Sequence, residues 1–448
     1  MKARARRADY WWDVPGRQPP DAASGEVGAG MHPRERSAGA HAVGRRDFLR
    51  LTAGVALAGT LAGCGRSASG VAPVPELAQG TPDDPVRQPL FAANQAIDGG
   101  LEPERGPLRV LNWPGYLWPK VLDDFGREFG VDCQLTSFAD LAQATRRLGA
   151  GGPGFDVFVP TQQVLPAYVA ARLLQPLNLS YVPNLRRNVW PVLADPFYDR
   201  GSRYSVPYTV YQTGLGWRTD TVGEDLARMA NPWDALWDPS HRGEVGVYDD
   251  YREALVAGLL HEGIQDVNTG EPRQVDRARD GLSQLTRLGV RYTLDGAYAK
   301  LPHGELGLVQ AWSGDMISAP YYLPAGQDPG VLRYVWPPDG GGAAAGGLIT
   351  GDCLTIPANA ANPVLAHHFL DFMLDTAHAT DNFSWLGYQP PLTALDTDRL
   401  VLDGLVPRTL ASAIVEPGDF HLGQVPLALP PQAEARWLHA WATVRRSA

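Results

Sequence analysis

The feature that most constrains the fold is the alternation, from Leu108 onward, of short apolar runs with amphipathic stretches. Leu108–Asn112 and the segments 131–136 and 155–160 predict strands, whereas Pro119–Phe129 and 163–173 predict helices. Strands and helices that alternate in units this short are typical of an α/β protein, in which helices cover the faces of a mostly parallel sheet.

The alternation continues through the second half of the chain, and a length of 448 residues allows two or three domains. Ser137, followed by Asp140, is predicted to cap the helix after the second strand, as in a capping box. A Gly/Ala-rich run at 340–347 predicts a loop. Further helices are predicted at 231–237, 252–261, 275–288 and 362–377, and further strands at 244–248, 306–312, 331–336 and 353–357.

The N-terminal stretch has the order of an export signal. Arg45 and Arg46 precede an uncharged apolar run at 51–63, and Leu-Ala-Gly-Cys closes that run at Cys64. A basic region, a short apolar region and small residues before a cut define a secretory signal. The run is too short to span a membrane as a helix. The alternative is a buried apolar helix beside a chance arginine pair.

Residues 1–63 resemble a twin-arginine lipoprotein signal, which implies that Cys64 becomes the lipid-modified N-terminus. The mature protein is then expected on the outer face of the cytoplasmic membrane, held by its lipid anchor. Met1 and Met31 are both candidates for the translation start. Residues 64–105 are rich in Ser, Gly, Pro and Ala, and this composition predicts a flexible tether.

Charge and cysteine content exclude some functions. The chain carries a net charge of −10, and removal of residues 1–63, with 10 basic and 6 acidic residues, leaves 29 basic against 43 acidic, a net of −14. Nucleic acid needs a basic face, so it is not an expected partner. An acidic surface would assist a cationic ligand, although plain solubility explains the acidic surface equally well.

Cys133 and Cys353 fit no metal spacing, and of the two alternatives, a disulfide or buried free thiols, free thiols are favoured.

Aromatic and acidic residues gather where predicted strands end. Ligands of open α/β sheets bind beyond the carboxyl ends of strands. Carboxylates form charge-assisted hydrogen bonds to ammonium groups, and aromatic faces attract the same cations. The residues at these positions are Trp113, Tyr116, Thr161, Asp249, Asp250, Glu253 and Trp312, while Asp352 stands at the start of the predicted strand 353–357.

Each of these residues also has a purely structural interpretation. Asp249 and Asp250 at a helix start would favour the helix dipole, and Trp113 and Trp312 would suit a core. A glycosidase-like enzyme is a further alternative, with Asp250 and Glu253 as acid and base. Three residues apart on one helix, however, these carboxylates would lie side by side rather than flank a bond.

Several segments, taken together and in order, resemble the spermidine/putrescine-binding proteins of bacterial ABC importers. The resemblance covers residues 108–440 or so. The segments are Asn-Trp-Pro-Gly-Tyr (112–116), Phe-Asp-Val-Phe-Val-Pro-Thr (155–161), Tyr-Ser-Val-Pro-Tyr (204–208), Trp-Asp-Ala-Leu-Trp-Asp-Pro (233–239), Asp-Asp-Tyr-Arg-Glu (249–253), Trp-Ser-Gly-Asp (312–315), Asp-Cys-Leu-Thr-Ile-Pro-Ala-Asn-Ala (352–360) and Leu-Gly-Tyr-Gln-Pro-Pro (386–391).

The resemblance implies a two-lobed, type II periplasmic-binding-protein fold with a hinge between the lobes. The first lobe would comprise 106–213 with 350–396, and the second 214–349 with 397–448. The family's site implies that Trp113, Tyr116 and Tyr388 pack on the ligand, Thr161 offers a hydroxyl, Asp250 and Glu253 hold one amine end, Trp312 stacks on the methylene chain, and Asp352 pairs with another ammonium.

Two departures from the family pattern affect the site. Gln163 and Thr350 stand where family members commonly carry aromatic residues, so the ligand is expected to be a different or more polar amine. A second reading keeps the fold and exchanges the polyamine for another small solute, such as an anion, iron or a phosphonate. The resemblance further implies a non-enzymatic monomer without cofactor or metal, whose partners are a permease pair and an ATPase.

Overall fold

The computed structural model describes residues 77–149, 154–337 and 346–447. Within these ranges no helix is long and apolar enough to cross a membrane. One nine-stranded sheet organises the chain in the order β2-β1-β3-β9-β4-β7-β5-β6, with β8 beside β4. The strands are β1 Leu108–Asn112, β2 Cys133–Ser137, β3 Val157–Phe158, β4 Ser205–Arg218, β5 Val245–Val247, β6 Arg291–Tyr292, β7 Leu308–Trp312, β8 Leu332–Val335 and β9 Leu348–Thr355.

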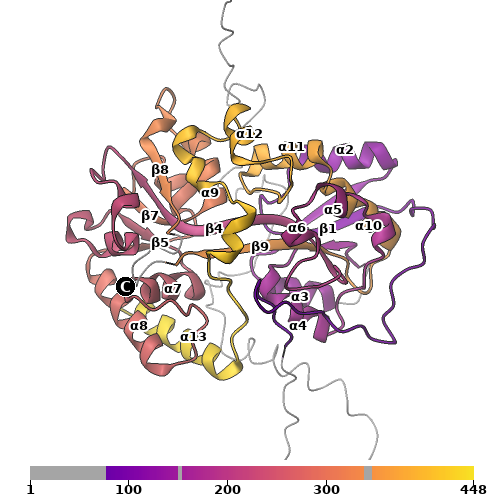
Figure 1. The fold of residues 1–448 in the computed structure, drawn as a ribbon, viewed down its shortest axis with the longest axis horizontal. Helices are drawn as coiled ribbons and strands as arrows, with labels where there is room; N and C mark the ends of the chain where they lie inside the picture. The colour runs from indigo at the N-terminus through magenta and orange to yellow at the C-terminus, as the bar shows by residue number, and fades with distance from the viewer. Residues whose placement is uncertain (1–76, 150–153, 338–345, 448) are drawn as a thin grey trace, which may run out of the picture.

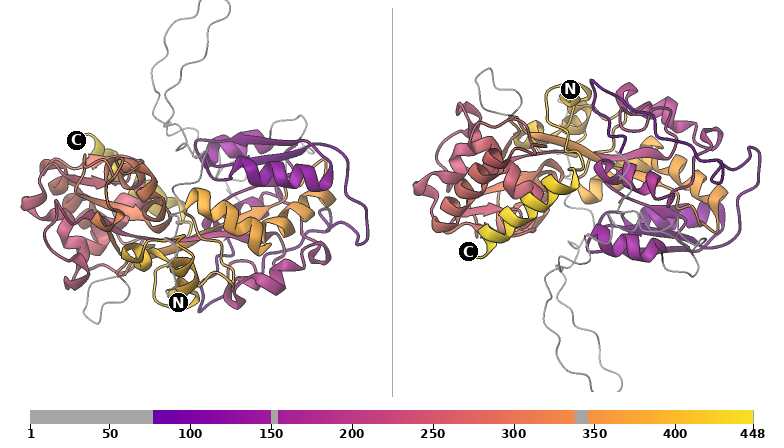
Figure 2. Two further views of the ribbon diagram at one scale, coloured as in Figure 1. Left: turned by 90° about the horizontal axis from the view of Figure 1, so that it is seen from above. Right: turned by 90° about the horizontal axis from the view of Figure 1, so that it is seen from below.

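Helices surround this sheet in two groups, which lie on either side of the long strands β4 and β9 (Figures 1 and 2). We refer to the half around β1–β3 as the first lobe and the half around β5–β7 as the second lobe. The α-helices are α2 Pro119–Phe129, α3 Leu141–Gly149, α4 Leu165–Ala170, α5 Asn184–Asn188, α6 Pro191–Ala194, α7 Tyr251–His261, α8 Pro272–Arg287, α9 Ser313–Ser318, α10 Pro363–Met373, α11 Thr376–Leu386, α12 Thr397–Leu402 and α13 Pro431–Arg445.

Strands β4 and β9 connect the two lobes. All fourteen residues of β4 are buried, and β4 pairs antiparallel with β9 along most of its length. Its second half also pairs with β7 of the second lobe, whereas β9 reaches β3 of the first lobe. Within each lobe the strands run parallel, as β1 with β2 and β3, and β5 with β6 and β7. The carboxyl ends of these parallel strands therefore face the gap between the lobes.

Helix α2 shows how the local sequence sets an element. Pro119 occupies the first turn, where the missing N–H costs nothing. Val121, Leu122 and Phe125 recur at helical spacing and are buried against the first lobe. Gly130 ends the helix with φ +67°, a left-handed conformation that glycine adopts without strain.

Most predicted elements are present, with ends shifted by a few residues. The structure differs at three of them. Segment 231–237 forms a 3-10 rather than an α-helix, and 163–173 divides into a short 3-10 turn and α4. Asp140 rather than Ser137 caps α3, because its Oδ1 accepts the Gln143 N–H at 2.7 Å while Ser137 ends β2.

Part of the predicted tether 64–105 lies against the body of the protein, although its composition favours flexibility. Gln88 is 1% exposed, and its side-chain amide donates to the Tyr198 carbonyl at 2.8 Å. Asn94 donates to the Leu174 carbonyl, and Glu104 accepts from the first turn of α10. These long-range bonds, which composition does not reveal, fix residues from 88 onward. Cys64 and the signal lie outside the described residues.

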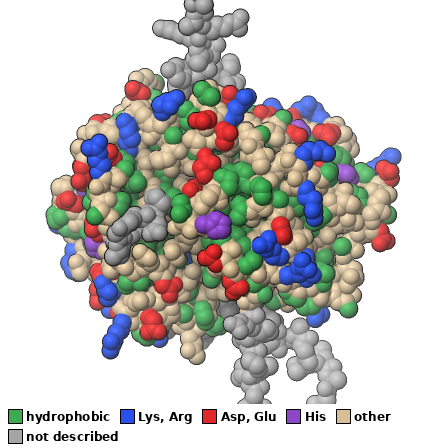
Figure 3. Space-filling view, viewed as in Figure 1, with side chains coloured by type: hydrophobic (Ala, Val, Ile, Leu, Met, Phe, Trp, Pro, Cys, Tyr) green, Lys and Arg blue, Asp and Glu red, His purple; other side chains and the backbone are tan. Residues whose placement is uncertain are grey.

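Two further expectations concern cysteines and surface charge. Cys133 and Cys353 are free thiols, as favoured from the sequence; Cys353 is buried and Cys133 is half-buried. On the face drawn in Figure 3, acidic and basic side chains are interspersed and form no basic stripe. That face therefore lacks the charge pattern that nucleic-acid binding needs.

Candidate functional site

The gap between the lobes is a cleft of about 2780 Å³. It is lined by all eight residues that the family resemblance assigned to the site: Trp113, Tyr116, Thr161, Asp250, Glu253, Trp312, Asp352 and Tyr388. Gln163 and Thr350, the two positions that depart from the family pattern, line it as well. The structure thus brings together side chains that are as many as 275 positions apart in the sequence (113 to 388).

The wall on the side of the first lobe, which we call the Asp352 wall, comprises Trp113, Tyr116, Thr161 and Asp352. Trp113 and Tyr116 follow β1, and Thr161 follows β3 and bridges to Asp352 on β9. Trp113 also packs on Phe138, with ring centroids 4.4 Å apart. Trp113 therefore belongs partly to the hydrophobic core, which is the structural interpretation that the sequence offered for it.

Asp352 has a carboxylate that is only half satisfied by the protein. Its Oδ2 accepts hydrogen bonds from the hydroxyls of Tyr116 at 2.7 Å and Thr209 at 3.3 Å. Its Oδ1 is buried and accepts none among the described residues. Burial raises the pKa of Asp352 to about 7, against the lowering effect of the two hydroxyls. An ammonium group at Oδ1 would satisfy the free oxygen and favour the ionised form.

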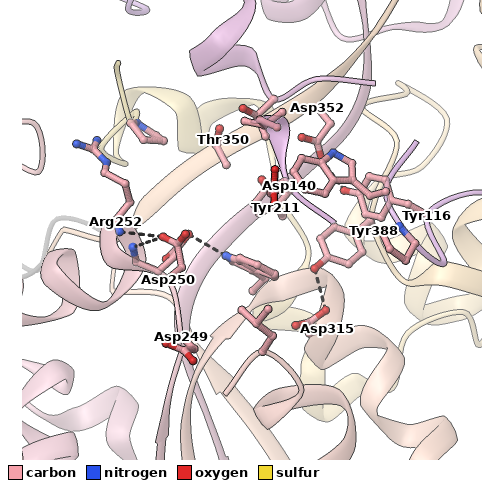
Figure 4. A pocket seen from close by; sticks show the side chains of 18 of the residues that line it. Tyr116, Asp140, Tyr211, Asp249, Asp250, Arg252, Asp315, Thr350, Asp352 and Tyr388 are labelled. Atoms are coloured by element: carbon pink, nitrogen blue, oxygen red, sulfur yellow. Dashed lines mark hydrogen bonds between the residues drawn. The ribbon is translucent and has the colours of Figure 1, made fainter. Parts of the chain in front are cut away.

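The wall on the side of the second lobe, the Glu253 wall, comprises Asp250, Glu253 and Trp312. Asp250 is the N-cap of α7, where its Oδ1 accepts the N–H groups of Arg252 and Glu253 at 2.8 and 3.0 Å. The helix-start interpretation of Asp250 is therefore correct, and the residue lines the cleft at the same time (Figure 4).

Glu253, like Asp250, is half-buried. Its Oε1 accepts the indole N–H of Trp312 at 2.9 Å, and its Oε2 accepts the Gln310 amide at 3.3 Å. Burial raises the pKa of Glu253 to about 7, and the charge of Asp250 adds to the rise. Glu253 also fixes the plane of the Trp312 ring, so acid and aromatic face are presented as one unit.

Aromatic rings line the cleft between the two acids. Tyr116 and Tyr388 meet edge to face at 4.9 Å, and Tyr388 and Tyr211 at 5.4 Å. Trp312 stacks on Tyr248 with centroids 4.1 Å apart and an interplanar angle of 22°. Such rings offer faces that cover methylene groups and attract cations.

Asp315 supports this aromatic group, and sequence reasoning missed its role. Its two carboxylate oxygens accept the hydroxyls of Tyr388 at 2.8 Å and Tyr248 at 2.9 Å. The Tyr248 hydroxyl in turn accepts the backbone N–H of Trp312 at 2.7 Å. Burial raises the pKa of Asp315 to about 6. In the sequence, the signal for this role was that Asp315 is the last residue of Trp-Ser-Gly-Asp (312–315), a segment that resembles the family.

No Lys or Arg in the described part of the chain forms an ion pair with Glu253 or Asp352. The nearby Arg252 is directed elsewhere, since its guanidinium lies over the Trp437 ring at 4.6 Å and donates to Asn268 at 2.9 Å. The inner cleft therefore presents uncompensated carboxylates and ring faces, an environment suited to an organic cation.

The chain is similar to known proteins over most of its length. The model of the bacterial extracellular solute-binding protein family matches residues 120–402. A putrescine/cadaverine-binding protein of Pseudomonas aeruginosa is 26% identical over 321 residues, covering 69% of this chain and 87% of the relative. A spermidine/putrescine-binding periplasmic protein of Escherichia coli is 26% identical over 289 residues, covering 64% and 78%.

Solved structures agree with this fold. The spermidine/putrescine transporter substrate-binding protein PotD of Streptococcus pneumoniae superposes with a TM-score of 0.62 at 21% identity, covering 76% of this chain and 99% of that one. The TpPotD lipoprotein of Treponema pallidum gives 0.63 at 21% identity, covering 75% and 99%. These matches confirm the predicted fold class, an α/β protein with two lobes of the type II binding-protein kind.

Proposed function

The chain belongs to the bacterial extracellular solute-binding protein family, and on that basis we propose that it captures a di- or polyamine of the putrescine–spermidine type for an ABC importer. Its relatives from Pseudomonas and Escherichia are named for the same class of ligand. The proposal concerns binding without chemical conversion, since Asp250 is engaged as a helix cap and leaves Glu253 without a facing catalytic partner on α7.

One observation carries the proposal. Asp352, which is buried, and Glu253, which is half-buried, lie on opposite walls of one cleft and have no ion-pair partner among the described residues. A buried charge without a counter-ion is costly. A ligand with an ammonium at each end and methylenes between them would meet both acids and lie along Trp312 and the tyrosines. An anionic solute would instead add like charge to the cleft.

The positions that depart from the family pattern bear on which amine binds. Gln163 and Thr350 place an amide and a hydroxyl on the cleft lining. Thr350 lies on β9 opposite Tyr211 of β4, two residues from Asp352. A polar substituent on the ligand would find a hydrogen-bonding partner there. We propose that this cleft accepts more polar amines than a cleft with aromatic residues at both positions.

Delivery requires an exported protein close to its transporter. The twin arginines 45 and 46 and the lipobox ending at Cys64 support export and lipid anchoring on the outer face of the cytoplasmic membrane. We propose that the protein acts there as a monomer and presents the ligand to a permease pair driven by an ATPase. Membrane fractionation tests the anchor, because Cys64→Ser should move the protein to the soluble fraction and retention in the membrane would contradict it.

Calorimetric titration tests the ligand class. We expect putrescine, cadaverine, spermidine or spermine to bind one to one, and 1,4-butanediol, which has the length of putrescine without its charges, to give no heat. Absence of binding by every amine, or equal binding of the diol, would overturn the proposal.

A further inference from the structure

Outside the cleft, one group of side chains in the second lobe has metal-ligand chemistry. Glu224 lies six residues after β4 ends. Asp238 caps, and His241 ends, the 3-10 turn Pro239–His241 just before β5. One ligand atom from each of the three residues lies within 4.8 Å of the others. None of the three lines the cleft.

His241 gives the second and independent indication of a ligand. The residue is only 8% exposed, and its Nε2 is buried without a hydrogen-bond partner among the described residues. The nearest carboxylate oxygen, Oε1 of Glu224, is 3.6 Å away, which is too far for a hydrogen bond. A buried ring nitrogen that meets no donor or acceptor is costly, and it is aimed at the carboxylate with which it would share an ion.

The spacing of the atoms suits a first-row metal. Zinc binds imidazole nitrogen and carboxylate oxygen at about 2.0–2.2 Å, so two tetrahedral ligands lie about 3.3–3.5 Å apart. The observed 3.6 Å between His241 and Glu224 is close to that separation. Because the side chains of Glu224 and Asp238 are exposed, small rotations of these two residues would complete the site.

The backbone that carries these ligands is already fixed. Val222 and Leu226, on either side of Glu224, are 1% and 0% exposed in the second-lobe core. Asp238 caps its turn by accepting the Ser240 N–H at Oδ1, at 2.8 Å.

We propose that Glu224, Asp238 and His241 form a binding site for a divalent transition metal, best matched by Zn²⁺, with solvent in the remaining position. One imidazole with two carboxylates is a ligand set that borderline metals accept. The ion would tie the segment after β4 to the turn before β5 and so stabilise the second lobe, apart from the solute cleft. The alternative is a simple histidine–glutamate ion pair, which predicts no metal affinity.

Titration of the untagged chain with Zn²⁺ tests the site. The protein carries Cys64→Ser to remove a competing thiol and is treated with chelator and desalted. We expect one tight equivalent, lost or weakened at least tenfold in His241→Ala and weakened in Glu224→Gln. His261→Ala is the matched control, because His261 pairs with the single carboxylate of Asp234 at 2.7 Å. It should bind Zn²⁺ as the parent chain does.

Two further measurements separate the site from a folding defect. Co²⁺ bound at the site should give the strong visible absorption of a tetrahedral ion, and this absorption should be absent in Glu224→Gln. Because the Glu224 side chain is exposed, Glu224→Gln should have the same melting temperature as the parent chain when both are metal-free. Zn²⁺ should raise the melting temperature of the parent chain and of His261→Ala, and leave that of His241→Ala unchanged. Failure of the parent chain to bind Zn²⁺, or equal binding by His241→Ala, would overturn the proposal.

Discussion

The two walls of the cleft hold their acidic side chains by different hydrogen bonds. On the Asp352 wall, hydroxyls of Tyr116 and Thr209 hold one carboxylate oxygen and leave the other free. On the Glu253 wall, Trp312 and Gln310 each donate an N–H, and both oxygens of Glu253 are engaged. The free oxygen of Asp352 thus needs a ligand to supply its hydrogen bond. Glu253 already has partners at both oxygens and also orients the Trp312 ring.

A pH series tests both walls at once and should give the largest effect. The pKa values of Asp352 and Glu253 are raised to about 7, while alkyl ammonium groups titrate near pH ~10. A cation favours the ionised acids, so affinity should be full above pH 8 and fall as the pH drops through 7. Two independent groups predict a loss of about 100-fold between pH 8 and pH 6. Calorimetry across this range would measure it, and a flat profile would show that neither acid contacts the ligand charge.

Replacement of Asp352 by Asn should give the next largest effect. The amide keeps the shape and can still meet the Tyr116 and Thr209 hydroxyls, but it loses the charge. Affinity for the amine should fall by about 1.5–3 kcal/mol, the scale of a hydrogen bond to a charged group, and the pH slope should become shallower. Asp249→Asn is the control, because Asp249 lines the cleft yet is exposed and contacts Arg445 at 3.4 Å. Unchanged affinity in Asp352→Asn would remove this residue from the site.

Glu253→Gln should weaken binding less, by about tenfold, because the amide oxygen can still accept the Trp312 indole N–H and keep the ring in place. A titration beside Glu262→Gln gives the comparison, since Glu262 ends the same helix and pairs with Arg277 outside the cleft. A larger loss than in Asp352→Asn would reverse the ranking of the two walls.

The smallest effect is expected from Asp315→Asn, which acts through the rings. An amide can accept only one of the two tyrosine hydroxyls at its oxygen, so Tyr248 and Trp312 should become less ordered, and affinity should fall several-fold. The ligand-induced change in tryptophan fluorescence should shrink in Asp315→Asn and shrink further in Trp312→Phe. An unaltered fluorescence response in Asp315→Asn would show that this carboxylate does not position the ring.

The sequence predicted much of this site because of one topological rule. Trp113, Tyr116 and Thr161 follow parallel strands of the first lobe, and the carboxyl ends of such strands meet at one edge. Asp250 and Glu253 follow β5 of the second lobe in the same way. Placement after strands was therefore enough to bring residues from both lobes to one cleft.

The parts that sequence reasoning missed depend on long-range pairing. Strand β4 contains Pro207, Gly214 and Gly216 among apolar and polar residues, so it shows neither alternation nor a continuous apolar run, and its fourteen buried residues went unassigned. Its Thr209 and Tyr211 were missed with it. Asp315 acts only through Tyr248 and Tyr388, which lie 67 and 73 positions away.

A crystal structure of the protein with putrescine would show whether both acids of the cleft bind the ligand. We expect the lobes to close on one diamine, with one nitrogen about 3 Å from Asp352 Oδ1, the other end at the Glu253 wall, and methylenes on the Trp312 face. A diamine bound elsewhere, or a closed cleft whose two acids contact no nitrogen, would contradict it.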